Sequence, residues 1–329
     1  MQIGLVDILR CPECGGELFL KHVRRKIDDD VVRGCIQCSE CDKPFEIKKG
    51  IVDMLYAPDS ALSYEMKYWD NIATWPKEPA LAQNLRESFL LRTYDCLGKI
   101  LQSYLHKKDS LLLFELGCGT GDTIELMPLN AKEVTYVGID LSIARLLIAS
   151  QRKSTGWKIN LIRGDGNKCL FRDKVDVAVS FAALHHLNLE KALRAISASL
   201  KKDGLYMLFE PNRLNFLASL GHNFVKNCFY TEIYSGALNK ERALNPFEVK
   251  LLAQSFGLTL KERKGMSGLS WPYVISAAIA GNSATVLAIR VREMLRALEK
   301  PVTIVDDFLR EVPLTFALSS SFLQIYEKR

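Results

Sequence analysis

The sequence contains no internal repeat and no low-complexity segment, so a solenoid or a disordered linker is excluded. Its first residues lack a basic stretch that leads into an apolar run, so we expect no secretory signal. No sign of charge dominates, because the net charge at pH 7 is only +6. This mild excess permits an anionic partner but does not require one. The apolar fraction of 48% is that of an ordinary globular protein.

The length of 329 residues predicts two units of unequal size. A short, polar and cysteine-rich segment comes first, then a helical segment, then a long stretch of alternating strands and helices. We therefore expect a small N-terminal domain at 1–56, a helical linker and lid at 57–109, and an α/β domain at 110–329. An apolar insertion interrupts the last domain at about 265–312.

The nine cysteines do not form a secreted disulfide framework, because their number is odd and four stand in two Cys-x-x-Cys pairs. This usage favours a reducing, cytoplasmic location. Cys11 and Cys14 form the first pair, and Cys38 and Cys41 form the second. Two such pairs can place four thiolates around one Zn²⁺. Cys35 also has a valid spacing to Cys38, so spacing alone leaves the second pair open.

The α/β domain is predicted from short apolar runs that alternate with helical periodicity. The alternation indicates βαβ units and a mainly parallel sheet. The strands are expected at Leu111–Leu116, Glu133–Ile139, Lys158–Arg163, Val175–Phe181, Leu205–Glu210, Leu258–Glu262 and Ser319–Tyr326. Helices are expected at Ile143–Arg152, at Leu189–Leu200 and from Pro246 to Gly257.

One region departs from this pattern. Gly265–Ile289 contains no charge over 25 residues, which is long enough to cross a bilayer. Its residues are small rather than strongly apolar, so we favour a buried helix or a pocket wall over a membrane span. Arg290–Lys300 follows as a basic amphipathic helix, and a solvated face is favoured there over peripheral contact with a membrane.

A glycine-rich turn follows the first strand of the α/β domain, where Glu115 to Gly121 reads Glu-x-Gly-x-Gly-x-Gly. Glycines there allow positive φ and close approach of a ligand, and the next helix begins at the same place. Asp140 ends the next strand and can accept ribose hydroxyls, while Asp165 follows the third strand and can reach an adenine amine. A dinucleotide fingerprint would need a glycine where this chain has Asp122, so that alternative is disfavoured.

This ordered set resembles the class I S-adenosylmethionine-dependent methyltransferases, in particular the small-molecule group similar to quinone methyltransferases. The resemblance covers about half the chain. It implies a doubly wound, Rossmann-like sheet of seven strands with a reversed last strand. It also implies S-adenosylmethionine at the carboxyl ends of the first strands, held by Glu115, Gly117, Gly119, Gly121, Asp140, Asp165, Gly166, Phe181 and Ala182.

The first segment is similar to the small zinc ribbons called Trm112-like, over about Leu9 to Leu55. That resemblance selects Cys11, Cys14, Cys38 and Cys41 as ligands and implies a structural zinc, because four thiolates leave no open position. Relatives of such ribbons activate separate methyltransferases. Here the ribbon is fused to its own domain, so we expect an internal brace.

The methyl acceptor is the least determined part. His185 and His186 follow the fourth strand and are candidates for a base or for an orienting contact, although such a pair often only shapes the pocket. Further acceptor contacts are expected from Glu210, Asn212, His222, Tyr230 and Tyr234. A small, apolar acceptor is favoured. The alternative is RNA recognised through the ribbon, but the ribbon has nine basic against ten acidic residues.

Overall fold

The computed structural model describes residues 1–56, 58–73, 80–105, 109–154, 156–215, 243–266 and 321–329, with nine positions between Arg290 and Phe308 and with Ser319. For residues 72–73 and 80–89 only the backbone is described. The expected contacts His222, Tyr230 and Tyr234 lie outside these residues, as does most of Gly265–Ile289. Within the described part, no helix is long and apolar enough to cross a membrane.

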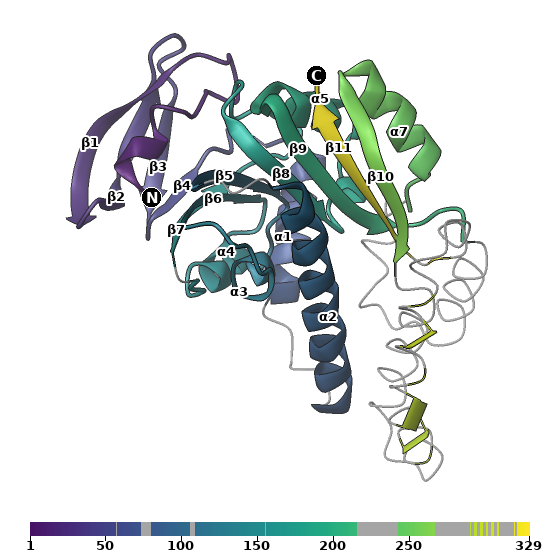
Figure 1. The fold of residues 1–329 in the computed structure, drawn as a ribbon. Coiled ribbons are helices and arrows are strands. Elements are labelled where there is room, and N and C mark those ends of the chain that lie inside the picture. The colour runs from purple at the N-terminus through teal and green to yellow at the C-terminus, as the bar shows by residue number, and fades with distance from the viewer. Residues whose placement is uncertain are drawn as a thin grey trace.

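The strands of the described part of the chain all belong to one mixed β-sheet (Figure 1). Its strand order is β1-β2-β3-β4-β7-β6-β5-β8-β9-β11-β10. The strands are β1 Leu18–Ile27, β2 Asp30–Cys38, β3 Pro44–Lys48, β4 Ile51–Asp53, β5 Ser110–Leu116, β6 Glu133–Asp140, β7 Trp157–Arg163, β8 Val175–Phe181, β9 Leu200–Pro211, β10 Leu258–Met266 and β11 Ser321–Lys328. In the centre of the sheet the neighbours β4, β7, β6, β5, β8 and β9 pair in parallel. Strand β11 is antiparallel to both of its neighbours, β9 and β10.

Seven of the described strands, β5 to β11, come from the expected α/β domain, and the sheet reaches eleven strands because β1 to β4 of the N-terminal segment join it. The N-terminal segment does not form a separate sheet. Its strand β4 pairs in parallel with β7, with Val52 opposite Ile162 and Asp53 opposite Arg163. An edge strand with free backbone groups is open to such pairing, and periodicity within one segment cannot predict it.

Helices cover both faces of the sheet (Figure 1). Their bounds are α1 Ser60–Ala73, α2 Ala80–Tyr104, α3 Asp122–Leu126, α4 Ile143–Ala149, α5 Leu189–Ser199 and α7 Pro246–Ser255, with short turns η1 Ile3–Leu5 and η2 Leu184–His186. Side chains of α2, α3 and α4 form one buried cluster with Leu111 and Leu113 of β5. Side chains of α5 and α7 belong to a second cluster, which contains Phe114 and Leu116 of the same strand. Burial on both faces explains why these strands read as continuous apolar runs. The α/β fold predicted from them is confirmed.

The N-terminal segment and the α/β part share one core. Leu9 and Phe45 of the former are fully buried and belong to the same cluster as Phe171 of the latter. Polar contacts cross the same junction: the backbone N–H of Gln2 donates to Asn160 at 2.8 Å, and that of Met54 donates to the carbonyl of Arg163 at 2.8 Å. The cysteine-rich segment is therefore packed against the sheet as part of one folded unit.

Candidate functional site

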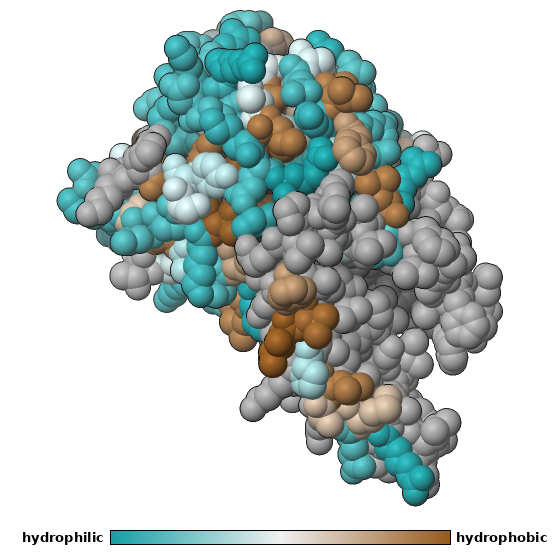
Figure 2. Space-filling view, turned by 45° about the vertical axis from the view of Figure 1, so that its right-hand side comes forward, coloured by the Kyte–Doolittle hydropathy of each residue, from teal (hydrophilic) through white to brown (hydrophobic). Residues whose placement is uncertain are grey.

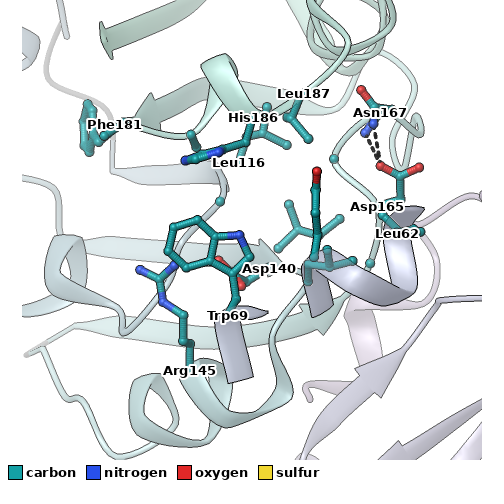
Figure 3. A pocket seen from close by; sticks show the side chains of 18 of the residues that line it. Leu62, Trp69, Leu116, Asp140, Arg145, Asp165, Asn167, Phe181, His186 and Leu187 are labelled. Atoms are coloured by element: carbon teal, nitrogen blue, oxygen red, sulfur yellow. Dashed lines mark hydrogen bonds between the residues drawn. The ribbon is translucent and has the colours of Figure 1, made fainter. Parts of the chain in front are cut away.

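A pocket lies at the carboxyl ends of β5, β6, β7 and β8, and α1 and α2 contribute to its wall (Figure 3). Carboxyl ends of parallel strands are the usual place for a ligand in an open α/β sheet. The lining combines apolar side chains with several carboxylates and one guanidinium. It consists of Leu62, Glu65, Trp69, Tyr94, Leu116, Gly117, Asp122, Ile139, Asp140, Leu141, Arg145, Gly164, Asp165, Gly166, Asn167, Phe181, Ala182, Ala183, His186 and Leu187.

The glycine loop, residues 117–121, borders this site through Gly117. Gly117, Gly119 and Gly121 have φ of 73°, 51° and 77°, a conformation that L side chains rarely adopt. A Cβ on Gly117 would lie 2.4 Å from that of Ala183. Gly117 lines the pocket, while Gly119 and Gly121 shape the loop behind it. The three predicted glycines are thus required by the backbone itself.

Asp140 connects this loop to the next strand and helix. Its Oδ2 accepts from the backbone N–H of Gly119 at 2.8 Å, and its Oδ1 accepts from that of Ser142 at 2.9 Å. The carboxylate is largely buried, but it also lines the pocket. Because each carboxylate oxygen can accept more than one hydrogen bond, Asp140 has capacity left for hydroxyl groups of a ligand.

Glu115 lies behind the loop and is not part of the pocket wall. Its carboxyl group accepts from the hydroxyl of Thr123 on α3 at 2.7 Å and from that of Tyr136 on β6. Complete burial raises the pKa of Glu115 to about 8, although these two hydrogen bonds act in the opposite direction. In this position Glu115 joins the loop, α3 and β6.

Asp165 and Gly166 lie across the pocket from the glycine loop. Asp165 accepts from the backbone and side-chain N–H groups of Asn167 at 2.9 and 2.8 Å, which fixes the turn after β7. A Cβ on Gly166 would lie 2.7 Å from Leu116 and 2.9 Å from Leu187. The gap between these two apolar side chains is therefore narrow, and the absence of a side chain at Gly166 keeps it open.

Phe181 and Ala182 line the pocket where β8 ends. The Phe181 ring meets that of Tyr94 edge to face, with 5.6 Å between centroids. Ala182 has a φ of 51°, which is uncommon for a residue with a side chain. Its backbone N–H donates to the carbonyl of Phe209 at 2.8 Å, so β9 holds the strained turn in place.

Trp69 and Arg145 are pocket residues that sequence reasoning missed. The Arg145 guanidinium lies 5.0 Å from the Trp69 ring centroid, and the Trp69 ring meets that of His186 edge to face at 5.1 Å. Next to Trp69, Asp70 accepts from the Ser142 hydroxyl at 2.5 Å and from the Ala144 backbone N–H at 3.1 Å. These contacts anchor α1 to the start of α4. They depend on tertiary packing and leave no local signal in the sequence.

His185 and His186 occupy different surroundings. His185 Nδ1 lies 2.7 Å from Oε2 of Glu210, which is fully buried. The other oxygen of Glu210 accepts from the backbone N–H groups of Ala183 and Leu184 at 3.0 and 2.8 Å. His186 lines the pocket, and burial lowers its pKa to about 3, with smaller contributions from His185 and Arg145. His186 is therefore neutral at physiological pH.

A second candidate site is the cysteine cluster. The sulfur atoms of Cys11, Cys14, Cys38 and Cys41 all lie within 4.8 Å of one another. Cys14 and Cys38 are 3.4 Å apart, and Cys11 and Cys41 are 3.7 Å apart. A tetrahedral zinc with Zn–S bonds of about 2.3 Å needs sulfur separations of roughly 3.8 Å, so the cluster fits such an ion. Cys35 is not part of it, because its thiol donates to the carbonyl of Ile36.

Residues 113–204 match a family model described as a methyltransferase domain. A probable S-adenosylmethionine-dependent methyltransferase of Saccharomyces cerevisiae is 30% identical over 151 residues, which are 44% of this chain and 50% of that protein. A malonyl-[acyl-carrier protein] O-methyltransferase of Priestia megaterium is 23% identical over 175 residues, or 50% of this chain and 59% of that protein. The chain thus spans only about half the length of these curated relatives.

Among solved structures, the geranyl diphosphate C-methyltransferase of Streptomyces coelicolor A3(2) has a TM-score of 0.51 at 14% identity, covering 83% of this chain and 100% of that one. This similarity concerns the fold. The family match indicates a methyltransferase domain within this chain, and the solved structure agrees with it in the Rossmann-like fold.

Proposed function

We propose that this protein transfers a methyl group from S-adenosylmethionine to a small, apolar acceptor. The observation that carries the proposal is the pocket in which the glycine loop and Asp140 meet at the carboxyl ends of β5 and β6. The narrower resemblance to quinone methyltransferases remains part of this proposal.

The pocket residues fit the three parts of S-adenosylmethionine. Asp140, which retains acceptor capacity, would hold the ribose hydroxyls. Leu116, Gly166 and Leu187 line the pocket and would contact the flat adenine, with Asp165 close to its amine. The open backbone of Gly117 would accommodate the methionine part. When bound, the cofactor supplies an electrophilic methyl group, which leaves the protein to position the acceptor and exclude water.

An apolar acceptor is supported by the remaining wall. Trp69, Phe181 and Leu187 line the pocket, and His186 is neutral there. The uncharged stretch Gly265–Ile289 begins at the end of β10. Strand β10 pairs with β11, β11 pairs with β9, and β9 is the neighbour of β8 in the sheet. Among the described lining residues Arg145 supplies the one guanidinium beside several carboxylates, so a highly anionic acceptor would find little neutralising charge there.

His185 lies outside the pocket lining but next to His186, with 4.0 Å between ring centroids, and we propose that His185 removes a proton if the acceptor atom carries one. Glu210 accepts from two backbone N–H groups and still contacts His185 Nδ1, so it can hold the ring in the tautomer with the proton on Nδ1. The other ring nitrogen is then a proton acceptor. His186, which is hard to protonate, would instead form part of the wall. We propose that a structural zinc in the cysteine cluster braces the junction with β7.

A second candidate function, methylation of RNA, is favoured by one observation. Although the ribbon is slightly acidic in total, its basic residues are not evenly spread. Arg25, Arg33 and Lys48 are exposed and lie side by side on β1, β2 and β3. Lys48 already pairs with Glu46, whereas Arg25 and Arg33 lie opposite each other, and like charges in that position destabilise a sheet unless an anion such as an RNA phosphate neutralises them.

One experiment separates these candidates. Purified protein is incubated with labelled S-adenosylmethionine and, in parallel, with apolar metabolite extracts and with total RNA. We expect label in the apolar extract. Label only in RNA, lost when Arg25, Arg33 and Lys48 are replaced by Gln, would replace the first proposal by the second. Failure to bind S-adenosylmethionine at all in calorimetry would refute both.

A further inference from the structure

Asp70, near the end of α1, reaches across to the start of α4. Its Oδ1 accepts a hydrogen bond from the hydroxyl of Ser142 at 2.5 Å and another from the backbone N–H of Ala144 at 3.1 Å. Asp70 and Ser142 are 72 residues apart in the chain. Helix α1 also lies outside residues 113–204, which match the methyltransferase model. Asp70 is therefore a contact that the matched domain receives from another part of the chain.

The orientation of Asp70 is itself unusual for a surface helix. Charged and polar residues give the described surface in Figure 2 its hydrophilic teal areas, and side chains of this kind mostly face water. Asp70 is instead half-buried and turned towards the first turn of α4. A carboxylate in that place is stabilised by the N–H groups that a helix leaves unpaired at its N-terminus.

Ser142, the N-cap of α4, is completely buried and connects Asp70 to the pocket. Its hydroxyl donates to Asp70, while the hydroxyl oxygen accepts from the backbone N–H of Arg145 at 3.2 Å. Its backbone N–H donates to Oδ1 of Asp140 at 2.9 Å. A hydroxyl that both donates and accepts cannot rotate freely, so Ser142 is held in one orientation between the two aspartates.

The Asp140 carboxylate depends on this arrangement. Ser142 donates to one of its oxygens and the backbone N–H of Gly119 donates to the other, at 2.9 and 2.8 Å. Because hydrogen bonds weaken steeply when their angle is poor, the positions of these two N–H groups determine how the carboxylate is turned. A displacement of Ser142 would therefore rotate Asp140, which lines the pocket, although Asp70 itself does not line it.

We infer that Asp70 is a positioning residue for cofactor binding, because through Ser142 it holds the Asp140 carboxylate in the orientation that receives ribose hydroxyls. The inference rests on the proposed function, in which Asp140 binds the ribose of S-adenosylmethionine. Asp70 contributes no contact to the cofactor. Its effect is confined to the hydrogen bonds that Asp140 makes with the two hydroxyl groups.

A plain attachment of α1 is the alternative. Trp69, the neighbour of Asp70, packs on Arg145 of α4, so loss of the Asp70 contacts could also disturb the pocket wall. The two roles differ in how they depend on the ligand. A disturbed wall weakens every ligand of the pocket, whereas a rotated Asp140 weakens only ligands that carry ribose hydroxyls.

Calorimetry with S-adenosylhomocysteine and its analogue without the 2′- and 3′-hydroxyls separates the two roles. The unmodified protein should prefer the hydroxylated ligand by roughly tenfold or more. Asp70→Ala and Ser142→Ala should each lower this preference to about threefold or less, and the double variant should lower it no further. Asp70→Asn should keep most of the preference, because its amide oxygen still accepts from Ser142.

Two variants on α1 serve as controls. Asp59 lies at the other end of the helix, where its Oδ1 accepts from the backbone N–H of Leu62 at 2.8 Å. Asp59→Ala should leave the preference for the hydroxylated ligand unchanged. Trp69→Ala should weaken both ligands by the same factor, because its ring belongs to the wall. Circular dichroism of each variant checks that the fold is retained.

Hydrogen exchange of the ligand-free protein gives a readout that needs no cofactor. The backbone N–H of Ser142 donates to Asp140 and not to Asp70, so its exchange reports on the connection between them. Asp70→Ala should accelerate this exchange, since a loosened N-cap opens more often. Asp59→Ala should not change it.

Two outcomes overturn the inference while the proposed function stands. These are an equal loss of affinity for both ligands in Asp70→Ala, and an exchange rate at Ser142 that Asp70→Ala does not change. Equal binding of both ligands by the unmodified protein would remove the ribose from Asp140 and overturn the inference as well. If the unmodified protein binds neither ligand, the proposed function fails together with it.

Discussion

The Oδ2 of Asp140 accepts a hydrogen bond from the backbone N–H of Gly119 at 2.8 Å. One carboxylate thus holds the glycine loop and also faces the pocket. Asp140→Asn keeps one oxygen acceptor but removes the charge, and we expect it to weaken S-adenosylmethionine binding by about 1.5–3 kcal/mol. Calorimetry measures this, with exposed Asp109→Asn as control. An unchanged affinity would remove Asp140 from the cofactor site.

Glu115 should make stability depend on pH. Its pKa rises on folding to about 8, so the folded state keeps the proton where the unfolded chain has already lost it. The corresponding stability is present below the ordinary pKa of about 4.5 and is lost as the pH rises towards 8. The free energy of unfolding of Glu115→Gln should therefore rise, relative to that of the unmodified protein, by up to about 1.4 kcal/mol per pH unit in this range.

Urea unfolding at several pH values between about 5 and 8 checks the prediction for Glu115. The exposed Glu190→Gln on α5 serves as the control and should not change the slope. If the free energy of unfolding changes with pH in the same way for Glu115→Gln and for the unmodified protein, this carboxyl group is ionised in the folded state.

The pair formed by His185 and Glu210 predicts a specific kinetic result for an acceptor that loses a proton. Glu210→Gln can still accept from a backbone N–H but no longer carries the charge that favours a protonated His185. We expect kcat to fall roughly hundredfold. The pH at which the rate is half-maximal should also shift. His186→Gln should mainly raise the apparent Kd for ligands, because His186 lines the wall. A Glu210→Gln profile that coincides with the original would leave Glu210 only a structural role.

The cysteine cluster predicts one zinc per chain. Cys38→Ser should lose the metal and lower the Tm of the whole protein, because the ribbon shares a core with the α/β part. The control Cys35→Ser should retain zinc, since the Cys35 thiol lies outside the cluster. Metal analysis of protein purified without added zinc is the measurement. A folded, metal-free preparation contradicts the prediction.

Trp69 tests the contribution of α1 to the pocket. Trp69→Ala removes the ring that contacts both Arg145 and His186, and we expect roughly tenfold weaker binding of S-adenosylmethionine. Tyr64→Ala on the same helix is the control, because that ring is 53% exposed and does not line the pocket. Equal losses for the two variants would point to a general effect on α1 rather than to the Trp69 ring.

The sequence by itself determined the features that depend on local spacing. Apolar runs and helical periodicity predicted the strand Val175–Phe181 in full, and they predicted β9 from Leu205, although it begins at Leu200. Glycine spacing identified the loop, since positive φ at Gly117 and its neighbours is a property of the backbone there. Paired cysteine spacing indicated a cluster, and the resemblance to zinc ribbons selected Cys38 and Cys41 over Cys35 as its second pair.

Only the tertiary structure decided what comes together from distant segments. The pairing of β4 with β7 extends the sheet to eleven strands, because unpaired backbone groups on one edge met those of another segment. Trp69 reaches the pocket through the contacts of Asp70 with α4, about 70 residues away in the chain. Likewise, Glu115 lies behind the glycine loop and outside the pocket lining, since burial depends on what packs around a side chain and not on its neighbours in sequence.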